Sequence, residues 1–431
     1  MANAVHDSDV SRGARAVLAL PMLGQGSNRD VDARLAEAAG LAEAIGIVVA
    51  ERLHFRVRSA RAATLFGSGQ VDSIAAAVVR DEAELVIVDA AITPIQQRNL
   101  EQATKAKVID RTGLILEIFG ERAATAEGRL QVELAHLDYQ AGRLVRSWTH
   151  LERQRGGFGF LGGPGETQIE ADRRMIRDRM ARLRKELAEV ARTRGLHRAR
   201  RQKAPWPVIA LVGYTNAGKS TLFNRITNAG VSAENLLFAT LDPTMREIPL
   251  AGFDKAILSD TVGFISELPT QLVAAFRATL EEVVSADLII HVRDIAHPDS
   301  EAQQSDVVQV LAEIGATAEN GPPLIEAWNK IDALTPDRRE TILAAAARKE
   351  RAVAISARTG EGVDRLLAAA SERLRAANTL RKVTVPASDG QALAWLHANG
   401  EIVRQRTDAL ETALEVRLSD ADWARFQRFQ R

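Results

Sequence analysis

The sequence contains no cysteine, and only 4% of its 431 residues are aromatic. Without cysteine, disulfides, thiolate metal sites and cysteine nucleophiles are excluded, and nothing indicates an oxidising compartment. The N-terminus lacks the apolar core of a signal peptide, and no apolar run approaches the ~20 residues of a membrane helix. We therefore expect a cytoplasmic protein that neither enters nor spans a membrane.

Net charge is absent as well, because 56 basic residues balance 56 acidic ones. The charges are unevenly distributed: residues 143–203 contain 17 Lys or Arg against 7 Asp or Glu, a strong local excess of positive charge. Such an excess is typical of a surface that binds a polyanion, although a solvated helix face has the same signature. Both interpretations stay open on charge alone.

The first part of the chain alternates short apolar runs with amphipathic stretches. Strands are expected over residues 16–20, 47–49 and 85–89, and helices over residues 31–45, 71–80 and 94–105. This alternation predicts a small parallel α/β unit. Nothing in it resembles a catalytic cluster, so the sequence assigns it no part in chemistry.

Two heptad-like apolar stripes follow, over residues 130–151 and 169–190. Each stripe would be about 33 Å long at helical rise, and a short loop separates them. Because so short a loop cannot connect parallel helices of this length, we expect an antiparallel hairpin. Glu166 lies just ahead of the second stripe, where its carboxylate would cap the following helix.

The loop between the stripes is rich in glycine, with six glycines among residues 156–165, yet it also contains Phe158 and Phe160. Arg153 and Arg155 precede them. Aromatic faces, exposed backbone and two arginines suit stacking on bases and contact with phosphates, so we expect these four residues to bind RNA. The alternative is a loop that packs back on its own protein.

A phosphate-binding loop follows the predicted strand over residues 208–212. Gly213-Tyr-Thr-Asn-Ala-Gly-Lys-Ser220 matches GxxxxGK[ST] and precedes a helix that begins near Thr221. The glycines let backbone N–H groups close around phosphate, and the helix N-terminus adds partial positive charge. Lys219 would neutralise the β- and γ-phosphates, and the Ser220 hydroxyl would ligate Mg²⁺.

A second element, Asp260-Thr-Val-Gly263, follows a predicted strand over residues 256–259. Asp260 at the strand end would hold Mg²⁺ through its water shell, and the Gly263 N–H would contact the γ-phosphate and sense its loss. Lys219 and Gly263 are therefore the candidate catalytic groups. Between the two elements, the hydroxyl of Thr240 or Thr244 would reach Mg²⁺ in the triphosphate state, and the residues alone do not decide between them.

Base selection is predicted from Asn329-Lys-Ile-Asp332, which ends a strand over residues 323–328. The Asp332 carboxylate would accept hydrogen bonds from the ring N–H and the amine of guanine, donors that adenine does not offer there. Ser356-Ala-Arg358, after a strand over residues 352–355, would frame the base from the other side. The sequence therefore favours GTP over ATP.

These motifs complete an α/β architecture in which a P-loop GTPase domain is preceded by a small α/β domain and an antiparallel helical hairpin. The last segment is a small α+β appendage with strands expected over residues 383–385 and 414–418 and helices over residues 391–397 and 420–429. The expected boundaries are 1–14 for a disordered N-terminus, 15–125 for the N-terminal domain, 126–203 for the hairpin with its Gly-rich tip, 204–379 for the GTPase domain and 380–431 for the appendage.

Several of these segments together resemble the HflX family of ribosome-associated GTPases. The resemblance rests on GPGETQIEADRR, GYTNAGKSTLFN, LFATLDPT, the DTVGFISELPTQLVAAFRATLEE run, NKID and SAR. It implies a cytoplasmic, monomeric protein that uses GTP, GDP and Mg²⁺, binds the large ribosomal subunit and its RNA, and splits stalled or idle ribosomes. It further implies that residues 238–242 bind GTP and that Thr240, with Ser220, contacts Mg²⁺. The candidate GTP-binding residues are then Gly213, Tyr214, Thr215, Asn216, Ala217, Gly218, Lys219, Ser220, Thr221, Phe238, Ala239, Thr240, Leu241, Asp242, Asp260, Thr261, Val262, Gly263, Asn329, Lys330, Ile331, Asp332, Ser356, Ala357 and Arg358.

One position departs from many GTPases, which place a glutamine directly after DxxG to orient the attacking water. This chain has Phe264, which cannot hydrogen-bond to water, so we expect slow turnover that rises when a partner orders the site. Two alternatives are an NTP-dependent RNA remodeller or helicase that also accepts ATP, and a non-enzymatic adaptor with structural nucleotide. Asp332 argues against the first, and the set of Lys219, Ser220 and Asp260 argues against the second.

Overall fold

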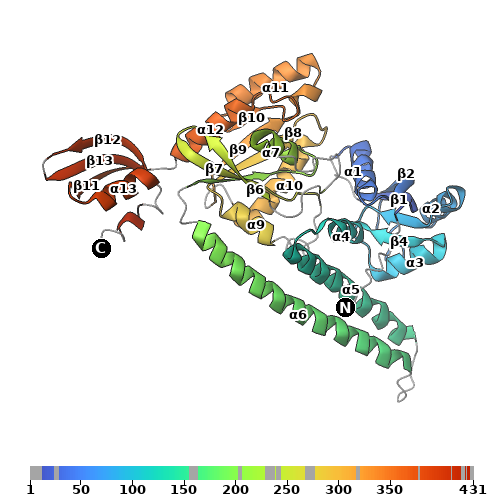
Figure 1. Cartoon of the computed structure of the whole chain (residues 1–431). Coiled ribbons are helices and arrows are strands. Elements are labelled where there is room, and N and C mark those ends of the chain that lie inside the picture. Colours follow the sequence, from blue (N-terminus) through green and yellow to red (C-terminus); the bar gives the residue numbers. More distant parts are fainter. Residues whose placement is uncertain are drawn as a thin grey trace.

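The computed structural model contains three separate sheets, with a long pair of helices alongside the first (Figure 1). The six-stranded sheet lies between the N-terminal and C-terminal sheets. Within the described part of the chain, no helix is long and apolar enough to cross a membrane. The structure describes residues 12–23, 29–154, 164–201, 206–228, 238, 244–266, 277–316, 321–376, 379–408, 410–418, 423 and 425–427.

The N-terminal domain is a four-stranded parallel sheet, as the alternation of strands and helices predicts, with strand order β2-β1-β3-β4. Its strands are β1 (Arg15–Leu23), β2 (Val48–Val57), β3 (Leu85–Val88) and β4 (Lys107–Asp110). Its helices are α1 (Val31–Glu43), α2 (Ser68–Arg80), α3 (Pro94–Thr104) and α4 (Arg111–Arg122). The fold includes part of the segment expected to be disordered, since Ala14 is buried and the Gly13 N–H donates to Gly46 O at 2.8 Å. Residues 1–11 lie outside the described residues.

Strand β4 and helix α4, which the sequence analysis missed, follow one another without a loop. Asp110 ends the strand and also caps the helix, because its carboxylate accepts the Gly113 N–H at 2.8 Å. The same carboxylate accepts the Tyr139 hydroxyl at 2.6 Å and an Arg143 N–H at 2.7 Å, both from the next helix. Asp110 thus connects the sheet to the hairpin and places Arg111 in the first turn of α4.

The expected antiparallel hairpin is formed by α5 (Ala126–Gln154) and α6 (Pro164–Arg201), which run side by side in Figure 1. A bidentate ion pair joins the two helices, with Arg179 donating to Glu133 at 2.7 and 2.8 Å. Helix α5 also buries Val132 and Ala135 in the cluster that it shares with the N-terminal domain, off the predicted stripe.

Helix α6 begins earlier than predicted, with Pro164 in its first turn, where proline lacks only an N–H that would have no helical partner. Glu166 therefore lies inside the first turn, and the prediction that it precedes the helix is wrong.

The central domain is a six-stranded sheet of order β10-β9-β8-β5-β7-β6, parallel except for β6. Strand β6 was not predicted, since it is an edge strand of mixed polar and apolar residues that tolerates Pro249. Its strands are β5 (Val208–Val212), β6 (Thr244–Leu250), β7 (Phe253–Asp260), β8 (Leu288–Asp294), β9 (Leu324–Asn329) and β10 (Ala352–Ala354). The helices are α7 (Lys219–Thr227), α9 (Arg277–Val284), α10 (Ser300–Glu313), the 3-10 turn η1 (Ile331–Ala333), α11 (Pro336–Arg348) and α12 (Val363–Ala376).

The C-terminal domain is a three-stranded antiparallel sheet of order β11-β13-β12 with helix α13 (Gly390–Asn399). Two of its strands and the helix coincide with predicted elements, whereas the mostly exposed edge strand β12 was missed. Phe426 closes the core against Trp395, with ring centroids 5.3 Å apart. The predicted helix over residues 420–429 falls largely outside the described residues, although 423 and 425–427 are helical. The strands are β11 (Thr379–Pro386), β12 (Glu401–Thr407) and β13 (Glu411–Leu418).

Candidate functional site

The predicted motifs converge at one edge of the central sheet. The P-loop follows β5, Asp260 ends β7, Asn329 ends β9 and Ser356 follows β10. These strands are parallel neighbours in the sheet, apart from β8 between β5 and β9, so their carboxyl ends lie together. Ligands of open α/β sheets bind at this edge, in the crevice outside the strand ends.

The P-loop lies close against the side chain of Asn329. Gly218 has a φ of +95°, and a β-carbon there would overlap Asn329 Nδ2, so glycine is required at this position. The Asn329 amide donates to Ala217 O at 2.8 Å, and its carbonyl accepts the Ala357 N–H at 2.8 Å. One asparagine side chain thus fixes the P-loop relative to the segment after β10.

Lys219 is buried at the N-terminus of α7 and turns back over the loop. Its Nζ donates to Gly213 O at 3.0 Å and to Tyr214 O at 2.9 Å. Burial lowers the pKa of Lys219 to about 8, partly opposed by the charge of Asp260. The side chain is therefore a positive charge held in a poorly solvated loop, which favours an anionic ligand.

Ser220 and Asp260 form the polar pair expected at a metal site. The Ser220 hydroxyl donates to Asp260 Oδ2 at 2.8 Å, and Asp260 is fully buried at the end of β7. Within the part of the chain that the structure describes, no group of three or more His, Cys, Asp or Glu side chains could hold a metal by itself. A hydroxyl beside a carboxylate instead suits a hard cation that takes its other ligands from phosphate and water.

The DxxG segment pairs directly with the P-loop. The Phe264 N–H donates to Gly213 O at 3.1 Å, and the Thr215 N–H donates to Phe264 O at 2.7 Å. A β-carbon on Gly263 would lie 2.8 Å from Thr215 Cγ2 and 3.1 Å from Lys219 Nζ, so only glycine fits this close approach. The structure therefore brings the two predicted catalytic groups, Gly263 and Lys219, together.

The residues predicted to recognise the base are also held by side-chain contacts. Asp332 accepts the Ser356 hydroxyl at 2.7 Å and pairs with Arg358 at 2.8 Å. Lys330 pairs with Asp294, at the end of β8, at 2.8 Å. The carboxylate of Asp332 is thereby oriented before any base arrives, as hydrogen-bonded selection requires.

The N-terminal domain reaches this site, which the sequence analysis did not foresee. The Tyr214 hydroxyl donates to Glu37 Oε2 at 2.7 Å and accepts the Ser266 N–H at 2.8 Å. Arg111 donates to Glu37 Oε1 at 2.6 Å and to Ser266 Oγ at 2.9 Å. Tyr214 of the P-loop and Ser266, three residues after Gly263, are thus hydrogen-bonded to side chains of α1 and α4. Glu37 and Arg111 belong to no sequence motif, and only the packing of the two domains brings them to the site.

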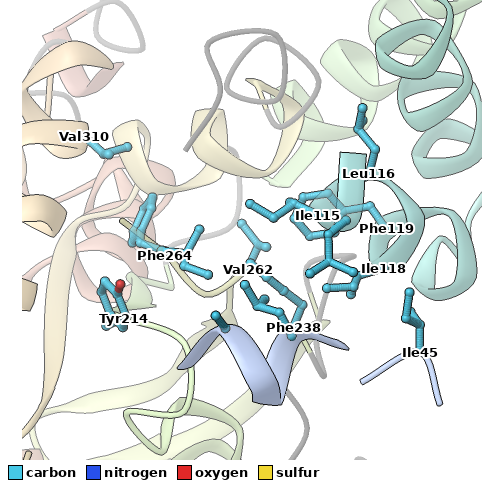
Figure 2. Packing of buried hydrophobic residues seen from close by; sticks show 14 of the residues in the cluster. Ile45, Ile115, Leu116, Ile118, Phe119, Tyr214, Phe238, Val262, Phe264 and Val310 are labelled. Carbon is cyan, nitrogen blue, oxygen red and sulfur yellow. The ribbon is translucent and has the colours of Figure 1, made fainter. Parts of the chain in front are cut away.

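Phe238 packs against the N-terminal domain. Its ring lies edge-on against Phe119 of α4, with centroids 4.7 Å apart and planes at 73°. Figure 2 shows both rings in one apolar cluster together with Val262 and Phe264. The buried core of the N-terminal domain is therefore continuous with apolar residues of the central domain, both in β5, before the P-loop, and in the segments that follow the P-loop.

The remaining candidates are less informative. Thr261 donates its buried hydroxyl to Leu211 O at 2.6 Å, a contact within the sheet. Arg153 lies near the end of α5. The following predicted residues lie outside the described residues: Arg155, Phe158, Phe160, Ala239, Thr240, Leu241 and Asp242.

Four family models match consecutive parts of the chain. Their descriptions are GTP-binding GTPase N-terminal for residues 32–120, GTP-binding GTPase Middle Region for 122–201, 50S ribosome-binding GTPase for 208–330 and HflX C-terminal domain for 341–429. The GTPase HflX of Magnetococcus marinus is 50% identical over 400 residues, which are 93% of this chain and 91% of that protein. The chain belongs to the HflX GTPase family. The GTPase HflX of Escherichia coli is 46% identical over 360 residues, 83% of each chain.

Membership of the HflX family makes this chain a GTPase. Among solved structures, a GTP-binding protein from Sulfolobus solfataricus in complex with GDP aligns with a TM-score of 0.45 at 23% identity. That alignment covers 84% of this chain and 98% of the other. The HflX C-terminal model begins within α11, earlier than the predicted boundary at residue 380, so it includes the last strand and helix of the central domain.

Proposed function

We propose that this HflX GTPase is a GTP-dependent switch that binds the large ribosomal subunit and separates stalled or idle ribosomes into subunits. One observation carries the proposal: Tyr214 in the P-loop and Ser266, three residues after Gly263, contact the domain that bears the helical hairpin. A rearrangement of the P-loop or the DxxG segment on loss of the γ-phosphate would therefore act directly on the domain that bears the hairpin. The description of the matching family model, a 50S ribosome-binding GTPase, supports the choice of partner.

GTP hydrolysis uses charge and position more than covalent chemistry. Lys219 would neutralise the β- and γ-phosphates, and the Gly263 N–H would contact the γ-phosphate. Mg²⁺ fits the oxygen pair of Ser220 and Asp260, with Thr240 as a further proposed ligand, and it would neutralise developing phosphate charge. Phe264 is buried and offers no hydrogen bond to water, so intrinsic turnover would be slow and a partner would supply the ordering.

The hairpin is the proposed RNA-binding element. Arg174, Arg177 and Arg182 are exposed on α6, so the basic excess of this region lies on a solvent face rather than in a core. Arg153, Arg155, Phe158 and Phe160 at the tip would contact ribosomal RNA by stacking and phosphate contacts. An ATP-driven remodeller is less well supported, because the oriented Asp332 carboxylate has no donor partner on adenine.

The test is a ribosome-splitting assay followed by light scattering, with GTP hydrolysis measured in parallel. Wild-type protein with GTP should split intact ribosomes, and large subunits should raise its hydrolysis rate by at least tenfold. A Lys219→Ala variant should do neither, because it loses the phosphate cation. A variant that still splits ribosomes, or a wild-type rate that large subunits leave unchanged, would contradict the proposal.

A further inference from the structure

Asp294 is a carboxylate beside the predicted base site to which no sequence motif assigns a role. It ends β8, where it is the strand partner of Asn329, the last residue of β9. Its side chain is 13% exposed, and both carboxylate oxygens are bonded. Oδ1 accepts the Ala296 N–H at 3.0 Å, and Oδ2 pairs with Lys330 Nζ at 2.8 Å. One side chain therefore caps the turn after β8 and holds the turn after β9.

The backbone of Lys330 adopts a conformation that needs such support. Its φ is +67° and its ψ is 32°, which is the left-handed region. A β-carbon makes this region unfavourable, so a residue other than glycine stays there only when its surroundings stabilise it. The end of β8 supplies two contacts that do so. One is the ion pair of Asp294 with Lys330, and the other is the Ile295 N–H, which donates to Asn329 O at 3.1 Å.

The left-handed turn determines where Asp332 lies. Lys330 connects β9 to η1, and Asp332 is the second residue of η1. A change in the φ of Lys330 rotates η1 relative to the sheet, and the Asp332 carboxylate moves with it. Ser356 and Arg358 hold that carboxylate from the segment after β10. Asp294 supports it from the opposite neighbour of β9, through the backbone of the turn.

We propose that Asp294 is a positioning residue for guanine recognition: its ion pair with Lys330 stabilises the left-handed turn and keeps the Asp332 carboxylate aligned with the base. The proposal rests on Asp332 as the residue that recognises guanine, and the ribosome plays no part in it. Because Asp294 acts through Lys330, loss of its charge should affect how tightly and how selectively the base binds, rather than the rate of the chemical step.

The first experiment measures the binding of GDP and of inosine diphosphate to the full-length protein by calorimetry. Inosine lacks the exocyclic amine of guanine, so the ratio of the two Kd values reports the contact with Asp332. Asp294→Asn removes the charge, while its amide oxygen can still accept the Ala296 N–H. This variant should weaken GDP binding about fivefold and lower the inosine-to-guanosine ratio about threefold, as expected when a charged hydrogen bond is lost. The kcat at saturating GTP should stay within about twofold of wild type, because the phosphate-binding residues are unchanged.

A matched control removes a different ion pair of the same domain. Glu361 pairs with Arg339 of α11 at 2.6 Å, in the segment that leads to α12. Glu361→Gln makes the same chemical change as Asp294→Asn, an acid to its amide, at an exposed pair. It should leave both Kd values at wild type, so a general effect of lost surface charge is distinguished from the effect at Asp294.

A double-mutant cycle tests whether Asp294 acts through Lys330. In a Lys330→Met background the ion pair is already absent, so Asp294→Asn should change the Kd ratio no further. Lys330→Met also leaves the cap on Ala296 intact. Its own lowered ratio therefore tests the proposal if Asp294→Asn proves too unstable to measure in thermal unfolding.

Asp332→Ala shows which part of the reasoning fails, since it should bring the Kd ratio close to one. A lowered ratio in Asp332→Ala with a wild-type ratio in Asp294→Asn would overturn the role of Asp294 alone. Equal effects of Asp294→Asn with and without Lys330 would overturn it too. A wild-type ratio in Asp332→Ala would overturn both that role and the assignment of Asp332 to guanine, and none of these results bears on ribosome splitting.

Discussion

The buried Lys219 makes GTP binding sensitive to alkaline pH in a way that can be calculated. Burial lowers its pKa from the usual 10.5 to about 8, so the ammonium form is lost as the pH rises through 8. When a triphosphate binds, several negative charges lie beside Nζ and raise the pKa again. The bound state then takes up a proton that the protein alone has released, and affinity falls as the pH rises.

The size of the effect follows from linkage. With a pKa of about 8 in the protein and a much higher value in the complex, affinity should fall about fourfold between pH 6.5 and 8.5. Binding should take up almost no proton at pH 6.5 and roughly three quarters of a proton at pH 8.5. Both numbers depend only on the pKa of one side chain.

Isothermal titration calorimetry in two buffers of different ionisation enthalpy measures affinity and proton uptake together. Lys219→Arg is the control, because its guanidinium stays charged throughout this range and any titration of the nucleotide is common to both proteins. The variant should show no proton uptake beyond that of the nucleotide itself. If wild-type and Lys219→Arg protein show the same pH profile, the pKa of Lys219 does not govern binding and the reasoning is wrong.

Three further predictions follow from the site geometry. Gly263→Ala should lower kcat by at least tenfold in single-turnover hydrolysis, because its β-carbon would lie 2.8 Å from Thr215 Cγ2; GDP affinity should change less than threefold. Asp332→Asn should move preference from GTP to xanthosine triphosphate in competition binding, since an amide nitrogen donates where the carboxylate accepted. Phe119→Ala should cost about 3 kcal/mol in denaturant unfolding by leaving a cavity beside Phe238, and an unchanged midpoint would contradict that packing.

The convergence of the sequence motifs at one edge of the central sheet was predictable, because each motif is local in the sequence and follows a predicted strand. Gly218 and Lys219 are needed wherever a loop must close on phosphate, and their spacing along the chain is the spacing in the site. Asp260 and Asn329 are distant in sequence, but both end predicted parallel strands, and such strand ends meet at one edge of a sheet. Most strands and helices of the fold were likewise predictable from their regular apolar patterns.

The elements that were missed have short or mixed patterns. Strand β4 has only four residues, β6 is an edge strand of mixed polar and apolar residues, and β12 is a largely polar edge strand, so their apolar periodicity is weak. The contact between the N-terminal domain and the P-loop left no trace in the sequence. Glu37 and Arg111 are distant in sequence from each other and from Tyr214, and only the packing of the two domains brings the three side chains into contact.

The central claim is that the γ-phosphate governs how firmly the protein binds the ribosome, through the contacts of Tyr214 and Ser266 with the N-terminal domain. The most direct measurement is the affinity of the full-length protein for purified large subunits, with GDP or with a non-hydrolysable GTP analogue, by co-sedimentation. We expect at least tenfold tighter binding with the analogue, and a smaller difference in the Arg111→Met variant. Equal affinity with the two nucleotides in the wild-type protein would contradict it.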